Sequence, residues 1–178
     1  MMISRKKAFF KLILFLLLFF ISFSYLLYGY QYFNLRKYHY DEAISTYGAV
    51  RILEGGMPYK DFWTLYAPGQ FYITAAVFNI FGVSIKIARI FAVIILSLTC
   101  CGVYFLVRRI CPKLFAVLAF LFSLALFKSY MVYNRPGQLA ILFFVLCCFA
   151  VLNYLKFKRP VWLVTTGILV GVTGLFRQ

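Results

Sequence analysis

Negative charge is scarce in this sequence. Only four of its 178 residues are acidic, against nineteen Lys and Arg residues, and charged residues of both signs make up 13% of the chain. A soluble globular domain carries about 25% charged residues. The sequence therefore excludes an ordinary soluble domain, in which water would have to solvate most of the surface.

Histidine and closely spaced cysteine pairs are scarce as well. The chain has one histidine and five cysteines, and it contains no C-x-x-C spacing. Structural zinc sites need four Cys or His ligands, usually at such spacings. The sequence excludes a zinc module, and we interpret the cysteines, four of which lie inside apolar runs, as small apolar side chains.

A basic soluble surface is missing too, although the net charge is +15. The Lys and Arg residues cluster at the ends of apolar runs and do not alternate with aromatic residues in a polar domain. Nucleic acid is therefore rejected as a partner. The positive-inside rule and contact with the phosphates of membrane lipids both explain this placement of charge.

Long apolar runs are what the chain has in abundance. Hydrophobic residues make up 65% of it and the mean hydropathy is +0.91. About 20 apolar residues, at ~1.5 Å each, cross ~30 Å of hydrocarbon. We predict an all-α integral membrane protein with about five transmembrane helices, at residues 8–28, 85–107, 114–133, 138–155 and 161–176.

The loop at residues 29–83 is predicted to hold two short amphipathic helices. Ala43, Tyr47, Val50 and Leu53 recur at helical spacing, and Gly55-Gly56 ends that pattern. The first helix is expected over 41–54 and the second over about 69–81. In the last predicted span, the Gly167-x-x-x-Gly171 spacing favours close helix packing.

Basic residues indicate the topology of the spans. The first apolar run is too long for a signal peptide and no A-x-A-like cleavage site follows it. With the N-terminus in the cytoplasm, the cytoplasmic segments hold ten basic residues and no acid, mostly in tight turns. The loop at 29–83 is then extracytoplasmic.

All four acidic residues lie in one window, between Tyr40 and Asp61. The adjacent pair Asp41-Glu42 begins the first amphipathic helix. Acidic residues favour helix N-termini, which accounts for one of the two without any chemistry. The other reading is a carboxylate above the membrane that accepts a proton or holds a divalent cation. Spacing alone leaves both readings open.

The flanking segments carry a family resemblance. Asp41-Glu42, GGMPYKD at 55–61, YAPGQFYITAAVFNIFG at 66–82 and Arg89 together resemble the first external loop of glycosyltransferases of the GT-C fold. The similarity is to the bacterial branch with protein O-mannosyltransferase-like, aminoarabinose-transferase-like and RgtA/B/C/D-like enzymes. The TGILVGVTGLFRQ end at 166–178 is similar to the fifth helix of that family, so the resemblance covers nearly the whole chain from residue 8.

The resemblance implies a multi-pass protein of the bacterial cytoplasmic membrane with an extracytoplasmic active site. Such enzymes move a sugar from a polyprenyl-phosphate donor to an acceptor, here a glycan, lipid or protein. It implies that Asp41 acts as base or as a metal-associated carboxylate, with Glu42 in support. Basic residues would bind the donor phosphate, and other side chains would line the cavity. The candidates for these two roles are Arg177 and Arg135 for the phosphate, and His39, Tyr59, Asp61 and Asn134 for the cavity.

The second external loop departs from the pattern of many relatives. It reads Asn134-Arg135-Pro136-Gly137 and holds no acid, which puts a divalent cation in doubt. Because the chain stops at Gln178 after the fifth span, we expect it to be the N-terminal part of a longer enzyme. The alternative function is a non-catalytic membrane scaffold or an inactive, truncated relative.

Overall fold

The computed structural model describes residues 2–32, 40–130, 134–135 and 137–177. Their regular secondary structure is helical, apart from one isolated bridge between Pro58 and Phe62. The helices are α1 (Met2–Tyr32), α2 (Tyr40–Leu53), α3 (Gly69–Phe81), α4 (Ile85–Ile110), α5 (Lys113–Tyr130), α6 (Gln138–Phe157) and α7 (Pro160–Gly174). The prediction of an all-α membrane protein is confirmed.

Among the described residues, three helices are long and apolar enough to cross a membrane: Phe9–Gly29 within α1, then α4 and α6. The other two predicted spans form α5, of 18 residues, and α7, of 15 residues. At ~1.5 Å per residue, α7 measures ~22 Å, which is shorter than the ~30 Å of a bilayer core. α2 and α3 occupy the places of the two short helices predicted in the loop.

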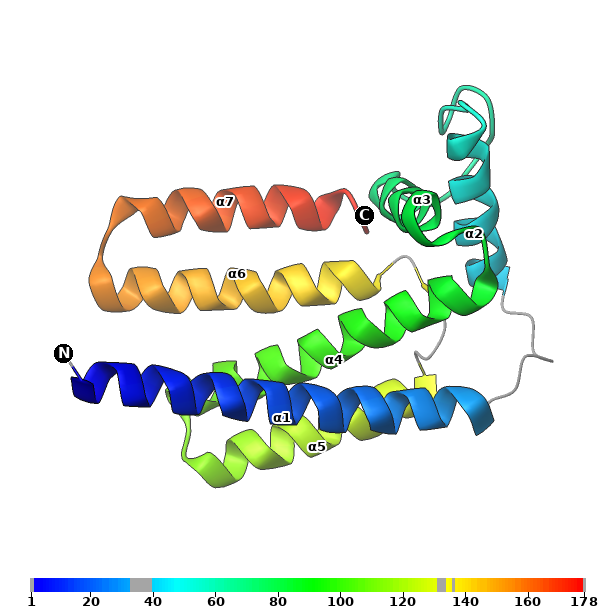
Figure 1. Cartoon of the computed structure of the whole chain (residues 1–178). Helices are drawn as coiled ribbons and strands as arrows, with labels where there is room; N and C mark the ends of the chain where they lie inside the picture. Colours follow the sequence, from blue (N-terminus) through cyan, green and yellow to red (C-terminus); the bar gives the residue numbers. More distant parts are fainter. Residues whose placement is uncertain (1, 33–39, 131–133, 136, 178) are drawn as a thin grey trace.

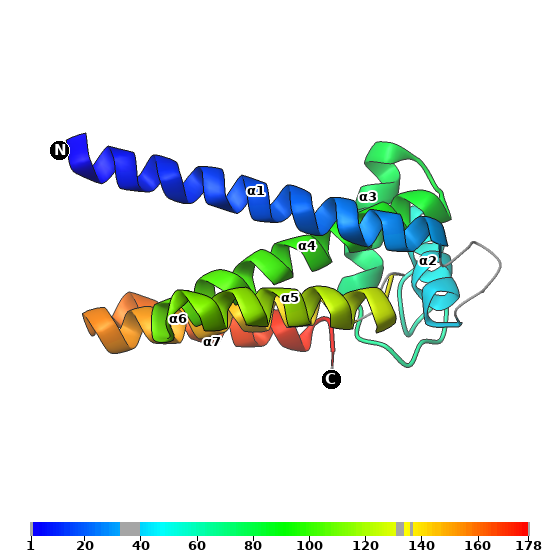
Figure 2. The same ribbon diagram turned by 90° about the horizontal axis from the view of Figure 1, so that it is seen from below.

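The five longer helices, α1 and α4 to α7, run alternately in opposite directions, and α2 and α3 lie across one end of them (Figure 1). We call this the loop end. The other end carries the first residues of α1, the turn at 111–112 between α4 and α5, and the turn at 158–159 between α6 and α7. We call it the turn end. Figure 2 shows α1 inclined to α6, so that the two helices spread apart toward the turn end.

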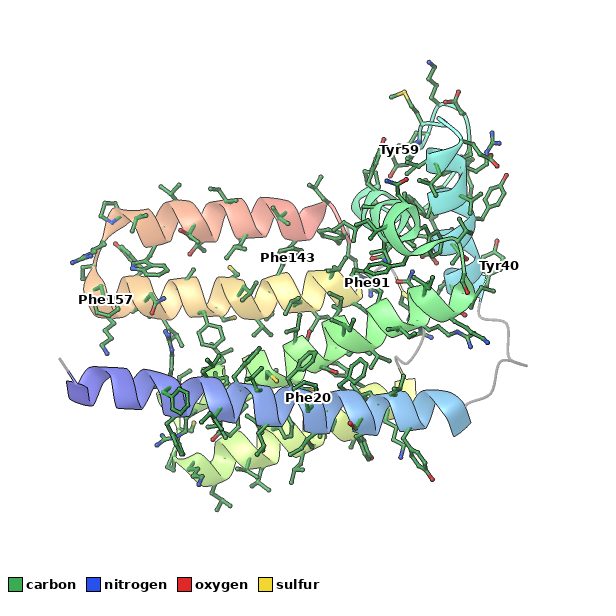
Figure 3. The ribbon with its side chains drawn as sticks, viewed as in Figure 1. Phe20, Tyr40, Tyr59, Phe91, Phe143 and Phe157 are labelled. Carbon is green, nitrogen blue, oxygen red and sulfur yellow. The ribbon has the colours of Figure 1, made fainter. Side chains whose placement is uncertain are left out.

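α4 is the central helix, because it packs against α1, α5 and α6. Val93, Leu96, Cys100 and Cys101 on α4 are fully buried in the main apolar cluster. The free cysteines thus serve here as small apolar side chains, in agreement with the interpretation from sequence. Side chains from the neighbouring helices fill the space around α4 (Figure 3).

The connection between α3 and α4, at the loop end, is determined by residues next to the ends of these helices. The Ser84 hydroxyl accepts a hydrogen bond from the backbone N–H of Lys86 at 3.2 Å and caps α4. Gly82, which ends α3, has φ of 90°, a conformation that favours glycine. The chain can therefore reverse sharply from α3 into α4, which brings the loop helices back over the bundle.

α7 packs against α6 and has no buried residue of its own. Beyond it, Phe176 is buried and stacks on Phe143 of α6 with ring centroids 5.3 Å apart. Apart from the adjoining residues and the backbone of α7 itself, no described atom lies within 4 Å of where a Cβ would stand at Gly167 or Gly171. The close packing predicted for these glycines is therefore not formed among the described residues.

Candidate active site at the loop end

A buried ion pair positions α2 on the bundle. The Nε and Nη2 atoms of Arg89, on α4, donate to the two carboxylate oxygens of Glu42, on α2, at 2.7 and 2.6 Å. The two side chains are 6% and 5% exposed. Because both oxygens are bound by one guanidinium, Glu42 acts as a clamp between the two helices.

α2 also packs tightly on α3. A Cβ on Gly48 would lie 2.6 Å from the ring of Phe71, so the helices approach closely only because residue 48 is glycine. Ala49 of α2, Ala75 and Phe78 of α3 and Ala88 of α4 form a small buried cluster beneath. Packing and the ion pair together determine where the first turn of α2 lies, and with it Asp41.

Asp41 lies beside Glu42 but has different surroundings. Its carboxylate is 37% exposed. One oxygen, Oδ1, accepts a hydrogen bond from the Tyr66 hydroxyl at 2.5 Å, and the other, Oδ2, lies 3.9 Å from Nε of Arg135. Asp41 is thus a half-exposed carboxylate between a phenol and a guanidinium, open on one side.

The contact with Asp41 raises the pKa of Tyr66 above its ordinary value of 10.0. The largest cause is the hydrogen bond to the carboxylate, followed by burial and by the negative charge of Asp41. At neutral pH Tyr66 is therefore a hydrogen-bond donor. It holds one carboxylate oxygen in place and leaves the other for a ligand.

Asp41, Arg135 and Arg177 line one cavity of about 360 Å³. They come from three elements far apart in sequence: α2, the connection between α5 and α6, and the residues after α7. The remaining lining residues are Leu65, Tyr66, Ala67, Gly137, Gln138, Ile141 and Phe176. One carboxylate and two guanidinium groups give the cavity a net positive charge, so it suits a ligand that carries an anion.

Two glycines allow Arg177 to reach the cavity. The N–H of Gly69 donates to the carbonyl of Leu175 at 2.8 Å, and a Cβ on Gly69 would lie 2.6 Å from that oxygen. A Cβ on Gly137 would lie 2.9 Å from Nη1 of Arg177. The end of α7 is therefore held against α3, with the arginine side chain beside the start of α6.

Asn134 does not line the cavity, but it helps hold the neighbouring Arg135. It is 1% exposed, and its Oδ1 accepts a hydrogen bond from Nε2 of Gln70 at 2.6 Å. Its Nδ2 lies 3.4 Å from the Thr74 hydroxyl, to which it donates. These amide contacts tie the described part of the α5–α6 connection to α3.

The other predicted cavity residues lie elsewhere. Asp61 is exposed and its Oδ2 accepts from the N–H of Met57 at 2.8 Å, which is the contact of a turn residue. Tyr59 donates its hydroxyl to the carbonyl of Tyr66 at 2.7 Å and is 57% exposed. Neither is among the described residues that line the cavity. His39 lies outside the described residues.

Residues 66–178, more than half of the chain, match the family of dolichyl-phosphate-mannose-protein mannosyltransferases. The chain belongs to this family. It is accordingly a membrane glycosyltransferase of the mannosyltransferase type. Searches of curated proteins and of solved structures found no match.

The match to the mannosyltransferase family includes Tyr66, Arg135 and Arg177 and begins after Asp41 and Glu42. The sequence did not assign the roles of two residues at this site, although both belong to the segments that carry the family resemblance. Arg89 is a cation near the start of an apolar span, where charge is costly and a partner is expected, but the sequence does not identify Glu42 as that partner. Tyr66 is one of fourteen tyrosines, and its contact with Asp41 has no local signal.

The described residues around Asp41 do not by themselves form a complete site for a divalent cation. Ca²⁺ takes six to eight oxygen ligands, and Mg²⁺ takes six, of which one or two are usually protein carboxylates and the others are waters or substrate phosphates. Asp41 is the one carboxylate among the described residues that line the cavity, and the guanidinium of Arg135 lies 3.9 Å from its Oδ2. Within the described chain, no three His, Cys, Asp or Glu residues group together.

Proposed function

We propose that this protein transfers a sugar from a polyprenyl-phosphate donor to a hydroxyl acceptor in the cavity at the loop end, with Asp41 as the general base. The observation that carries the proposal is the convergence of Asp41, Arg135 and Arg177 on one cavity. Family membership supports glycosyl transfer with mannose as the first donor sugar to test.

Arg177 and Arg135 are proposed to bind the donor phosphate. During transfer the phosphate becomes a leaving group and gains negative charge, so cations directed at it lower the barrier. A guanidinium binds two phosphate oxygens at once, which a lysine cannot do. The two arginines come from different elements: Arg135 from the α5–α6 connection and Arg177 from the residues after α7.

The proposed step is a displacement at the anomeric carbon. The acceptor oxygen forms a bond to that carbon, and the bond from the carbon to the phosphate oxygen breaks. Polyprenyl phosphate leaves with the bonding electron pair, and the acceptor proton passes to the Asp41 carboxylate. Tyr66 holds Oδ1, so Oδ2 is the oxygen that takes the proton.

A groove beside the cavity is proposed to guide the acceptor. It has a volume of about 250 Å³ and shares Leu65 and Tyr66 with the Asp41 cavity. Aromatic side chains of Tyr40, Tyr47 and Trp63 line it. A sugar ring stacked on such a wall would place a hydroxyl near Asp41, whereas a purely lipid acceptor would not need it.

The loop end is proposed to face away from the cytoplasm of a bacterial cell. The turn end carries basic residues on α1, at the end of α4, at the start of α5 and in the 158–159 turn, and all four acids lie between residues 41 and 61, in α2 and the loop that follows it. This distribution follows the positive-inside rule. The cavity would then meet a donor on the extracytoplasmic leaflet.

Transfer in proteoliposomes tests the proposal. The full protein is supplied with polyprenyl-phosphate mannose and oligosaccharide acceptors, and labelled product is counted. Asp41→Asn should abolish transfer, whereas Asp61→Asn, which changes an acid in the same segment outside the cavity, should leave it within about twofold. Wild-type protein that transfers no sugar from any polyprenyl-phosphate donor would favour the alternative, a non-catalytic scaffold.

A further inference from the structure

A second large cavity lies between α1, α4 and α6 and opens toward the turn end. Its volume is about 880 Å³, and it forms where α1 spreads away from α6 (Figure 2). Phe105, Leu142 and Leu146 contribute to walls that are mainly apolar. An apolar cavity of this kind is not favourably filled with water. In a bilayer, the acyl chains of lipids fill apolar spaces of this kind.

Three cations border the cavity: Lys11 of α1, and Arg108 and Arg109 of α4. The Arg109 guanidinium donates from Nη1 to Oδ1 of Asn153 at 2.6 Å and lies 4.8 Å from the centre of the Phe149 ring. α6 thereby holds this arginine at the edge of the cavity. The cations thus come from two helices and converge on one apolar space.

Among the described residues, no carboxylate pairs with these cations. All four acids of the protein lie between residues 41 and 61, in α2 and its following loop at the other end of the bundle. A ligand with an apolar body and an anionic head would complement both the walls and the charge. A zwitterionic lipid complements only the walls, because its own cation offsets the phosphate.

We propose that this cavity is a binding site for one anionic glycerophospholipid, whose acyl chains fill the space between α1 and α6 and whose phosphate contacts Lys11, Arg108 and Arg109. The site is separate from the Asp41 cavity and does not depend on the transferase reaction. Its occupant would fix the angle of α1 against α4, since α1 packs on α4 and α5 and the cavity lies between α1 and α6.

Native mass spectrometry of the protein released from nanodiscs of equimolar phosphatidylglycerol and phosphatidylcholine tests the site. The wild type is expected to retain phosphatidylglycerol in preference. Lys11→Gln with Arg108→Gln should lower that retention roughly fivefold for each cation removed. The matched control, Lys156→Gln with Arg159→Gln, removes the same charge at the same end outside the cavity and should keep the preference.

A second variant tests the apolar part. Leu146→Trp adds volume inside the cavity and should lower the retention of both lipids while leaving the charge unchanged. Equal retention of the two lipids by the wild type would overturn the proposal. So would an equal loss in the two double variants, which would mean that the cations act only as general surface charge. Far-ultraviolet circular dichroism confirms that each variant keeps its helices.

Discussion

Glu42 and Arg89 form a bidentate ion pair that is almost completely buried and that joins α2 to α4, 47 residues apart in sequence. The neighbouring carboxylate, Asp41, is half-exposed and lines the cavity. Two adjacent acids therefore have different roles: one holds the loop helix on the bundle, and the other is available to a ligand.

Removing one partner of this clamp should destabilise the protein strongly. Glu42→Gln removes the carboxylate that pairs with the buried Arg89 charge, and breaking a buried ion pair costs about 3–5 kcal/mol. Glu54→Gln, which breaks the exposed pair between Arg51 and Glu54, should cost about 0–1 kcal/mol. Thermal unfolding in detergent measures both. An equal loss of stability in the two variants would contradict the structural role of the Glu42–Arg89 pair.

Tyr66→Phe should slow transfer without abolishing it, because Asp41 keeps its carboxylate and loses the group that orients it. Tyr72→Phe, on the exposed face of α3, is the control and should have little effect. The measurement is the rate at saturating donor together with the KM for the acceptor. A change in acceptor KM alone would place Tyr66 in binding and not in orientation.

The raised pKa of Tyr66 predicts a dependence on alkaline pH. Because the folded protein favours the neutral phenol, its contact with Asp41 stabilises the fold fully below the ordinary pKa of 10.0. That stabilisation is lost as the pH rises from 10.0 through the raised value. The difference in unfolding free energy between wild type and Tyr66→Phe should therefore shrink above pH 10. A constant difference would contradict the hydrogen bond.

Gly69→Ala should destabilise the loop end. Its Cβ would meet the backbone carbonyl of Leu175 at 2.6 Å, and overpacking of this kind costs about 1–3 kcal/mol. The control, Gly167→Ala, adds a Cβ in open space and should be neutral or slightly stabilising. Transfer should fall in Gly69→Ala, because the end of α7 carries Arg177. Unchanged melting in both variants would contradict the docking of α7 on α3.

Arg177→Gln should lower transfer by about 10²–10³-fold, the usual loss when one group that stabilises a transition state is removed. Arg177→Lys should keep only part of the wild-type transfer rate, because an ammonium group cannot bind two phosphate oxygens in a bidentate contact. Arg51→Gln removes a cation of α2 outside the cavity and serves as the control. Full activity of the Arg177→Lys variant would mean that residue 177 contributes only a positive charge and makes no bidentate contact with the phosphate.

Much of the helical architecture followed from the sequence, because apolar runs, glycine stops and basic flanks are local signals. The helix predicted from Gly69 to Phe81 agrees with α3 in both bounds. The convergence of Asp41 with Arg177 was suggested by family resemblance and could not be derived from spacing. Nothing local relates the start of α2 to the residues after α7, 136 positions later, since tertiary packing alone brings them together.

Spacing could not separate the roles of Asp41 and Glu42, which only the family resemblance distinguished. Both are acids in the first turn of one helix, and both satisfy the rule for helix N-termini. The difference between them depends on which side of α2 faces α4 and Arg89. Periodicity indicates an apolar face, but it does not identify the buried cation that one of the acids will meet.

Single-turnover transfer at saturating donor tests the central claim most directly, because it separates donor binding from chemistry. Asp41→Asn protein should bind labelled polyprenyl-phosphate mannose as the wild type does, since Arg135 and Arg177 are intact, and should transfer at least 10²-fold more slowly, in line with the usual contribution of a general base. Transfer by Asp41→Asn at the wild-type rate would contradict the assignment of Asp41 as the base.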